Sequence, residues 1–177
     1  MELNLTELET RQHHFLTPAA GVNFGHAASV CFEDQGHGLL TNIIGEGHFV
    51  SNYAITRYDV NEEMKRTWND EEDATEQGAY GMAFLVASNE MKFKAIEKSR
   101  KKTGIDYWLG EEENFLFQNK VRLEVSGIRK GTDQQLSTRF DGKMAQSKKS
   151  DPTGLPALIV VVEFSGPRIK TGLRNII

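Results

Sequence analysis

The chain has 177 residues, of which 38% are hydrophobic, and this length and composition are typical of one globular domain with a sizeable core. No stretch approaches the roughly 20 apolar residues of a membrane span, and the first residues lack the basic and apolar regions of a secretory signal. The single cysteine, Cys31, excludes an intramolecular disulfide and a cysteine-based zinc site. We therefore expect a cytoplasmic protein with no membrane partner.

The net charge of −4 is distributed unevenly along the chain. Residues 1–90 hold 4 Lys/Arg and 15 Asp/Glu, a net charge of −11, whereas residues 91–177 hold 17 Lys/Arg and 10 Asp/Glu, a net charge of +7. A basic half suits a polyanion such as nucleic acid. It equally suits an acidic protein partner, which includes the N-terminal half of a second copy, so a homo-oligomer or a subunit of a larger complex is also expected.

The first 72 residues predict a polar N-terminal extension followed by an antiparallel β-meander. Glycines separate the three expected strands, which cover residues 27–33, 39–44 and 49–59. Gly-His pairs recur every 11 residues, at positions 25–26, 36–37 and 47–48. Three histidines suggest a metal site, but strand ends with this spacing alternate between opposite edges of a sheet, which favours ordinary hairpin corners.

Residues 73–177 predict the order helix, strand, strand, strand, helix, strand. An acidic run leads into a helix that begins at Asp73 and reaches about Glu90, and a polar helix begins at Thr132 or Asp133 and reaches about Ser147. The expected strands cover residues 93–99, 105–109, 115–128 and 158–162, the last being apolar throughout and therefore buried on both faces. We expect a single α+β domain with a mixed sheet, in which the meander continues into an αβββαβ core.

The strand over residues 118–127 has two different faces, because side chains alternate along a strand. Val121, Leu123 and Val125 form an apolar face, and the other face carries Glu124 among cations and hydroxyls. Asp106 opens the strand just upstream. Two carboxylates on neighbouring strands can hold a divalent metal against a phosphate. The alternative is a solvated sheet face, in which Asp106 binds turn amides and Glu124 pairs with Arg122 or Lys120.

In this order of elements, with Asp106 and Glu124 in register, residues 73–177 resemble the PD-(D/E)XK nuclease superfamily, which has the restriction-endonuclease-like fold. The resemblance implies Mg²⁺ or Mn²⁺ held by Asp106 and Glu124, with Glu76 on the first helix as a further ligand. Glu76 also fits a capping box with Asp73. The basic residues expected to grip the nucleic-acid backbone are Arg100, Lys101, Lys102 and Arg122.

The chain departs from the family pattern at Ser126, which stands where the motif has its lysine. The catalytic cation is then expected from elsewhere, either from Lys120 on the same strand or from Lys143 on the following helix. Two functions stay open. One is a metal-dependent nuclease, either on its own or as a subunit of a bacterial antiviral-defence or DNA-processing complex; the other is a non-catalytic assembly module with a degenerate site.

Overall fold

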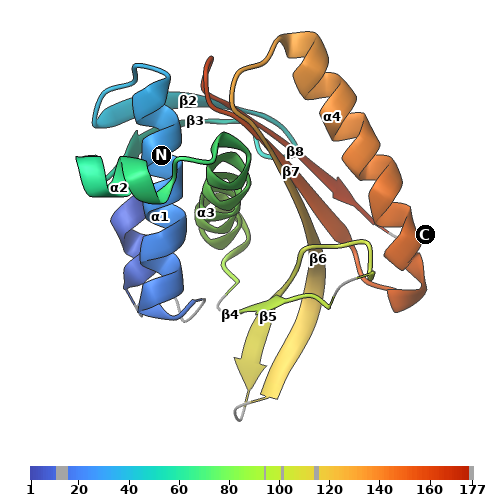
Figure 1. The fold of residues 1–177 in the computed structure, drawn as a ribbon. Helices are drawn as coiled ribbons and strands as arrows, with labels where there is room; N and C mark the ends of the chain where they lie inside the picture. The colour runs from blue at the N-terminus through green and yellow to red at the C-terminus, as the bar shows by residue number, and fades with distance from the viewer. Residues whose placement is uncertain (11–15, 94, 101, 114–115, 176–177) are drawn as a thin grey trace.

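The fold is α+β and is built on one eight-stranded mixed sheet with helices on both faces (Figure 1). The computed structural model describes residues 1–10, 16–93, 95–100, 102–113 and 116–175. The strand order is β1-β3-β2-β8-β7-β6-β5-β4, with parallel pairing between β1 and β3, between β2 and β8, and between β6 and β7. The strands are β1 (Glu2–Asn4), β2 (Leu40–Gly47), β3 (Ser51–Thr56), β4 (Ala95–Lys98), β5 (Tyr107–Glu113), β6 (Leu116–Ile128), β7 (Ala157–Glu163) and β8 (Arg168–Arg174).

Three α-helices lie on one face of the sheet and a fourth lies on the other face (Figure 1). The first group is α1 (Pro18–Asp34), α2 (Glu62–Thr67) and α3 (Glu71–Met91), and the opposite helix is α4 (Asp133–Gln146). Short 3₁₀ segments, η1 (Leu5–Glu9) and η3 (Ser147–Thr153), follow β1 and α4. None of the helices in the described ranges is long and apolar enough to cross a membrane.

The order expected for residues 73–177 is present as α3, β4, β5, β6, α4 and β7, and β8 extends it. The helix α3 begins slightly earlier than expected, because the side chain of Asp70 accepts a hydrogen bond from the Asp73 amide at 2.9 Å and acts as the N-cap. Asp73 is therefore not the cap, and Glu76 has no capping-box role. The predicted start of α4 is confirmed by a complete capping box between Thr132 and Gln135.

The predicted strand over residues 27–33 is wrong, because this segment belongs to α1. Thr17 caps the helix, Pro18 occupies its first turn, and its glycines, Gly21 and Gly25, allow close contact with η1 and Tyr58 and form no hairpin corners. A Cβ atom on Gly78 of α3 would lie 2.9 Å from the Ala28 Cα atom, so the two helix backbones are nearly in contact. The meander is thus reduced to the antiparallel β2–β3 hairpin, which joins the same sheet as the core through β8.

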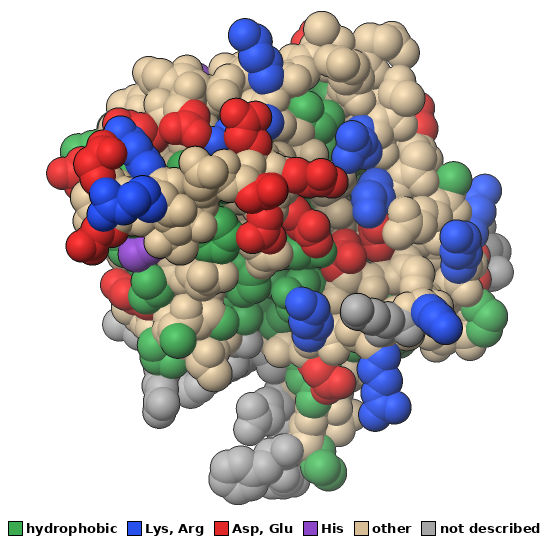
Figure 2. Space-filling view, in the orientation of Figure 1, with side chains coloured by type: hydrophobic (Ala, Val, Ile, Leu, Met, Phe, Trp, Pro, Cys, Tyr) green, Lys and Arg blue, Asp and Glu red, His purple; other side chains and the backbone are tan. Residues whose placement is uncertain are grey.

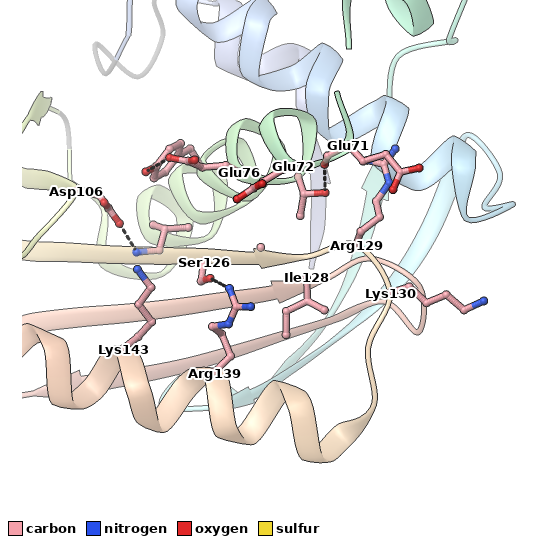
Figure 3. Close-up of a pocket in the computed structure, with 14 residues that line it drawn as sticks. Glu71, Glu72, Glu76, Asp106, Ser126, Ile128, Arg129, Lys130, Arg139 and Lys143 are labelled. Atoms are coloured by element: carbon pink, nitrogen blue, oxygen red, sulfur yellow. Dashed lines mark hydrogen bonds between the residues drawn. The ribbon is translucent and has the colours of Figure 1, made fainter. Parts of the chain in front are cut away.

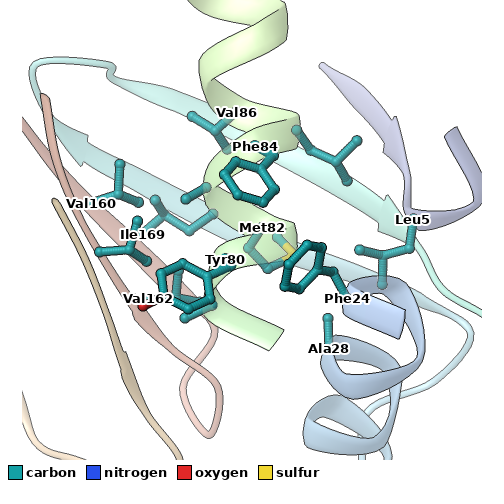
Figure 4. Packing of buried hydrophobic residues seen from close by; sticks show 14 of the residues in the cluster. Leu5, Phe24, Ala28, Tyr80, Met82, Phe84, Val86, Val160, Val162 and Ile169 are labelled. Carbon is teal, nitrogen blue, oxygen red and sulfur yellow. The ribbon is translucent and has the colours of Figure 1, made fainter. Parts of the chain in front are cut away.

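The main core lies between the sheet and the helices α1 and α3 (Figure 4). The strand β7 is buried at every position, and its side chains divide between two clusters. Leu158, Val160 and Val162 pack towards α3, whereas Ala157, Ile159 and Val161 pack under α4 with Leu136. The prediction of a central strand buried on both faces is confirmed, and both helices are held by one strand next to β6.

Candidate functional site

The polar face of β6 is covered by α4 and η3. Val121, Leu123 and Val125 enter the main core, as the alternation predicts. On the opposite face, Arg122 and Glu124 are 0% exposed. Because a buried charge is costly unless it is paired or hydrogen-bonded, each of these side chains needs partners from the covering elements. The hypothesis of a solvated sheet face is therefore wrong for this part of the strand.

Asp106 is attached directly to β6 just before β5 begins. Its Oδ2 atom accepts a hydrogen bond from the Val125 amide at 2.8 Å, and its own amide donates to the Leu123 carbonyl at 3.0 Å. The pairing of β5 with β6 starts with Tyr107, the first residue of β5, opposite Leu123. Residues of β6 after Leu123 therefore have no β5 residue beside them. Burial raises the pKa of Asp106, while the Val125 amide and Lys143 act in the opposite direction. The Asp106 carboxylate thus stands at the free edge of β6, next to Glu124.

Glu124 is held by two side chains from α4. Its Oε1 atom accepts hydrogen bonds from Lys143 Nζ at 2.5 Å and from Gln146 Nε2 at 2.6 Å. Its Oε2 atom is buried and has no hydrogen-bond partner in the described part of the chain. Burial, and secondarily the charge of Asp106, raises the pKa of Glu124 to about 7, although Lys143 lowers it. One carboxylate oxygen of Glu124 is therefore buried and unsatisfied among the described residues.

The helix α4 presents a row of donors to this face of β6. Arg139, Lys143 and Gln146 follow one another at helical spacing, so they share one side of the helix. Arg139 Nη1 donates to the hydroxyl of Ser126 at 3.0 Å. The position of the motif lysine is thus occupied by a serine that binds an arginine, and the cation nearest to Glu124 is Lys143.

A cavity of about 620 Å³ opens between α3, the free edge of β6 and α4 (Figure 3), and Glu124 is in contact with one of its lining residues, Lys143, without lining it itself. Glu71, Glu72 and Glu76 border it on the α3 side, and Figure 2 shows acidic side chains gathered on this face of the molecule with Lys and Arg close by. The Glu76 carboxylate accepts a hydrogen bond from the Tyr80 hydroxyl at 3.0 Å. Asp106, Ser126 and Lys143 also border the cavity. The structure therefore places Glu76, Asp106, Ser126 and Lys143 around one cavity, and Glu124 reaches this group through its contact with Lys143.

Arg122 does not belong to this site, and its predicted contact with nucleic acid is wrong. The guanidinium group donates to the carbonyls of Leu155 and Ser147 at 2.8 and 2.9 Å, and it pairs with Asp151 at 3.2 Å. These bonds attach η3 to the sheet, so the buried cation is structural. Arg174 of β8 completes the cluster by pairing with the same Asp151 carboxylate.

The remaining predicted cations that the structure describes, Lys120, Arg100 and Lys102, do not border the main cavity. Lys120 is exposed on β6, four residues before Glu124, and it does not border the cavity. Arg100 and Lys102 border a smaller cavity of about 360 Å³, which shares Tyr80 and Asp106 with the main one. Lys101 lies outside the described residues.

The sequence reasoning missed Arg139, Gln146, Glu71 and Glu72. For the first two, a signal was available, because they recur with Lys143 at the 3.6-residue period of a helix that was itself predicted. The two glutamates were assigned only to the acidic run before α3. Their place at the cavity depends on how α3 crosses the sheet, which the local pattern does not contain.

The oxygen ligands fit a hard divalent cation whose coordination shell is completed by water or substrate. Asp106 and Glu124 supply carboxylate oxygens, and the buried Oε2 atom of Glu124 has no other partner among the described residues. No group of three or more His, Cys, Asp or Glu side chains poised to hold a metal occurs within the described ranges. Mg²⁺ commonly binds through one or two carboxylates with waters and substrate phosphates. The pair therefore fits this mode of binding and does not fit an all-protein metal cage.

Comparison of the chain with protein-family models, with curated proteins and with solved structures finds no match.

Proposed function

We propose that this protein is a metal-dependent nuclease that hydrolyses phosphodiester bonds. The observation that carries the proposal is the contact between Lys143 and Glu124 beside Asp106 at the edge of an open cavity. Two carboxylates of raised pKa and one cation, converging from a loop, a strand and a helix, form an arrangement suited to a phosphoryl centre.

Each of the three side chains has a separate part in this reaction. Asp106 and Glu124 would hold Mg²⁺ or Mn²⁺, which when bound neutralises phosphate charge and acidifies a water molecule. Lys143 places its ammonium group at Glu124, where it can donate to a phosphate oxygen or orient the attacking water. The water oxygen forms the new bond to phosphorus, the P–O ester bond breaks, and the leaving oxygen takes up a proton.

The position of Lys143 supports an active site over a degenerate one. In the PD-(D/E)XK pattern that the sequence resembles, the lysine follows the motif carboxylate on the same strand, and here that position is Ser126. The cation instead comes from α4 and contacts the same carboxylate. The order α3, β4, β5, β6, α4 and β7 is consistent with this resemblance.

A cleavage assay tests the proposal. End-labelled and internally labelled DNA and RNA oligonucleotides are incubated with the purified chain and Mg²⁺, Mn²⁺ or EDTA. The expected result is metal-dependent cleavage that Asp106→Asn lowers at least about 100-fold. Asp73→Asn is the matched control, because Asp73 is exposed on α3 and does not border the cavity. Cleavage of equal rate in Asp106→Asn and the wild type would contradict the proposal.

A further inference from the structure

The cavity has an acidic wall on α3 and a basic wall on α4, and Arg129 and Lys130, which follow β6, also line it. Glu71, Glu72 and Glu76 stand on the α3 side, whereas Lys143 and Arg139 reach towards β6 from α4 on the other side (Figure 3). Within the described ranges, none of the three glutamates lies within 4.0 Å of a Lys or Arg nitrogen. The α3 glutamates are therefore not neutralised by the cations of α4, of which Lys143 pairs with Glu124 and Arg139 donates to Ser126.

These walls suit a polymer with a single phosphate backbone. A nucleic-acid strand carries one negative charge per nucleotide, and proteins bind it through Lys and Arg. A duplex carries a second backbone, and in this cavity the second backbone would face the carboxylates of Glu71 and Glu72. A single strand instead turns its bases away from the cations, and carboxylates can accept hydrogen bonds from base amino groups.

Two further cavities adjoin the main one and share lining residues with it. One of about 630 Å³ runs along α4 and shares Lys130, Arg139 and Lys143 with the main cavity. The other, of about 360 Å³, lies at the turn before β5, where Lys98, Arg100 and Lys102 line it. Cations from α4 and from the turn before β5 therefore line a connected set of cavities around Asp106. A nucleic-acid strand can therefore bind here at an internal position, without a free 5′ or 3′ end at the site.

We propose that the substrate of this site is single-stranded nucleic acid, bound internally along α4 and the turn before β5, with the α3 glutamates excluding the second strand of a duplex. The binding mode is independent of catalysis. Its consequence, cleavage at internal positions of a strand, rests on the proposed nuclease function. DNA and RNA share the backbone chemistry that the cations recognise, so the two are compared directly below.

The test measures binding by fluorescence anisotropy in EDTA, where metal-dependent cleavage is absent. The probes are a linear 30-nucleotide single-stranded DNA, the RNA of the same sequence, a circular single-stranded DNA and a 30-base-pair duplex. We expect the wild type to bind a single strand at least about 10-fold more tightly than the duplex, and to bind the circle as tightly as the linear DNA. The tighter of the DNA and RNA probes identifies the natural polymer.

The double variant Glu71→Gln/Glu72→Gln tests the role of the acidic wall. It should bind the duplex several-fold more tightly and so reduce the preference for a single strand. The matched control is Glu62→Gln/Glu63→Gln, which removes the same two charges from the first turn of α2, away from the cavity, and should leave the preference unchanged.

Equal affinity for duplex and single strand, a requirement for a free end, no binding to any probe, or an unchanged preference in Glu71→Gln/Glu72→Gln would each overturn the inference. Failure of the proposed nuclease function has a different signature. In that case single-strand binding with the expected preference persists, but no probe is cleaved when metal is added.

Discussion

The Nζ atom of Lys143 lies 2.5 Å from Oε1 of Glu124, although the two residues belong to a helix and a strand and are 19 positions apart in the chain. Glu124 is 0% exposed, so this contact places a cation at the edge of a buried carboxylate. The same carboxylate oxygen also accepts a hydrogen bond from Gln146, one turn further along α4. Ser126 on the strand carries no charge, and the cation in contact with Glu124 comes from the following helix.

Replacing Lys143 with methionine should abolish most of the cleavage while the fold is retained. The substitution keeps much of the side-chain length but removes the charge that faces Glu124 and the substrate phosphate. We expect a loss of at least about 100-fold in the single-turnover rate, the usual size of such a contribution. Lys148→Met, at an exposed position just after α4, is the control. A wild-type rate in Lys143→Met would remove this residue from the mechanism.

A second-site variant tests whether Lys143 stands in for the motif lysine. Ser126 lies two residues after Glu124 on the same strand face and borders the cavity, so a lysine there can reach the same carboxylate. Ser126→Lys in the Lys143→Met background should raise the cleavage rate at least about 10-fold above that of Lys143→Met alone. Ser126→Met in that background controls for loss of the hydroxyl bond to Arg139. Equal rates for the two double variants would show that the cation has no such role.

The stability of the metal-free protein should fall as the pH rises from about 4.5 to 7. Burial raises the pKa of Glu124 from 4.5 to about 7, so within this window the folded protein binds more protons than the unfolded chain. The free energy of unfolding then decreases with rising pH and levels off above pH 7. Asp106 contributes in the same direction.

Urea unfolding in EDTA at constant ionic strength between pH 5 and 8 measures this effect. The part due to Glu124 should amount to about 1–3 kcal/mol and should be absent in Glu124→Gln, whose profile is flatter. A wild-type profile that rises through this window, or one that Glu124→Gln leaves unaltered, would mean that Glu124 does not carry the shifted pKa.

Arg122 should matter for stability and not for binding. Arg122→Met leaves the carbonyls of Ser147 and Leu155 without a donor and removes the ion pair with Asp151. We expect a loss of about 3 kcal/mol in the free energy of unfolding, measured in urea, and unchanged affinity for nucleic acid per folded molecule. Lys120→Met, on the same strand but exposed, should change stability by no more than about 0.5 kcal/mol. Unchanged stability together with weaker nucleic-acid binding in Arg122→Met would show that Arg122 binds nucleic acid.

Gly127 sets the close approach of α3 to β6. A Cβ atom there would lie 2.5 Å from the Thr75 carbonyl oxygen and 2.7 Å from Thr75 Cγ2. Gly127→Ala should therefore push α3 away from the sheet and cost about 1–3 kcal/mol in thermal or urea unfolding. Gly142→Ala in α4 meets nothing within 4 Å and should stabilise the protein by up to about 1 kcal/mol. Equal effects of the two substitutions would contradict this packing.

The sequence was informative where a pattern is local. Alternation along β6 predicted which residues enter the core, the apolar run of β7 predicted a strand buried on both faces, and the order of elements placed Asp106 beside Glu124. The helix α1 was missed because its glycines, Gly21 and Gly25, serve close contact with Leu8 and Tyr58, and this reason lies outside the helix. Likewise, alternation places Arg122, Glu124 and Ser126 on one polar face, but only the crossing of α4 and η3 decides that the first two are buried.

The most direct test of the central claim is calorimetric titration with Mn²⁺, because it requires no knowledge of the substrate sequence. Asp106 and Glu124 are proposed to form one divalent-cation site, so the wild type should bind one equivalent of Mn²⁺, and Asp106→Asn/Glu124→Gln should not bind it. Addition of a phosphodiester analogue should strengthen wild-type binding, since the protein supplies only part of the coordination shell. Undiminished Mn²⁺ binding in the double variant, or no binding by the wild type with the analogue present, would contradict the account.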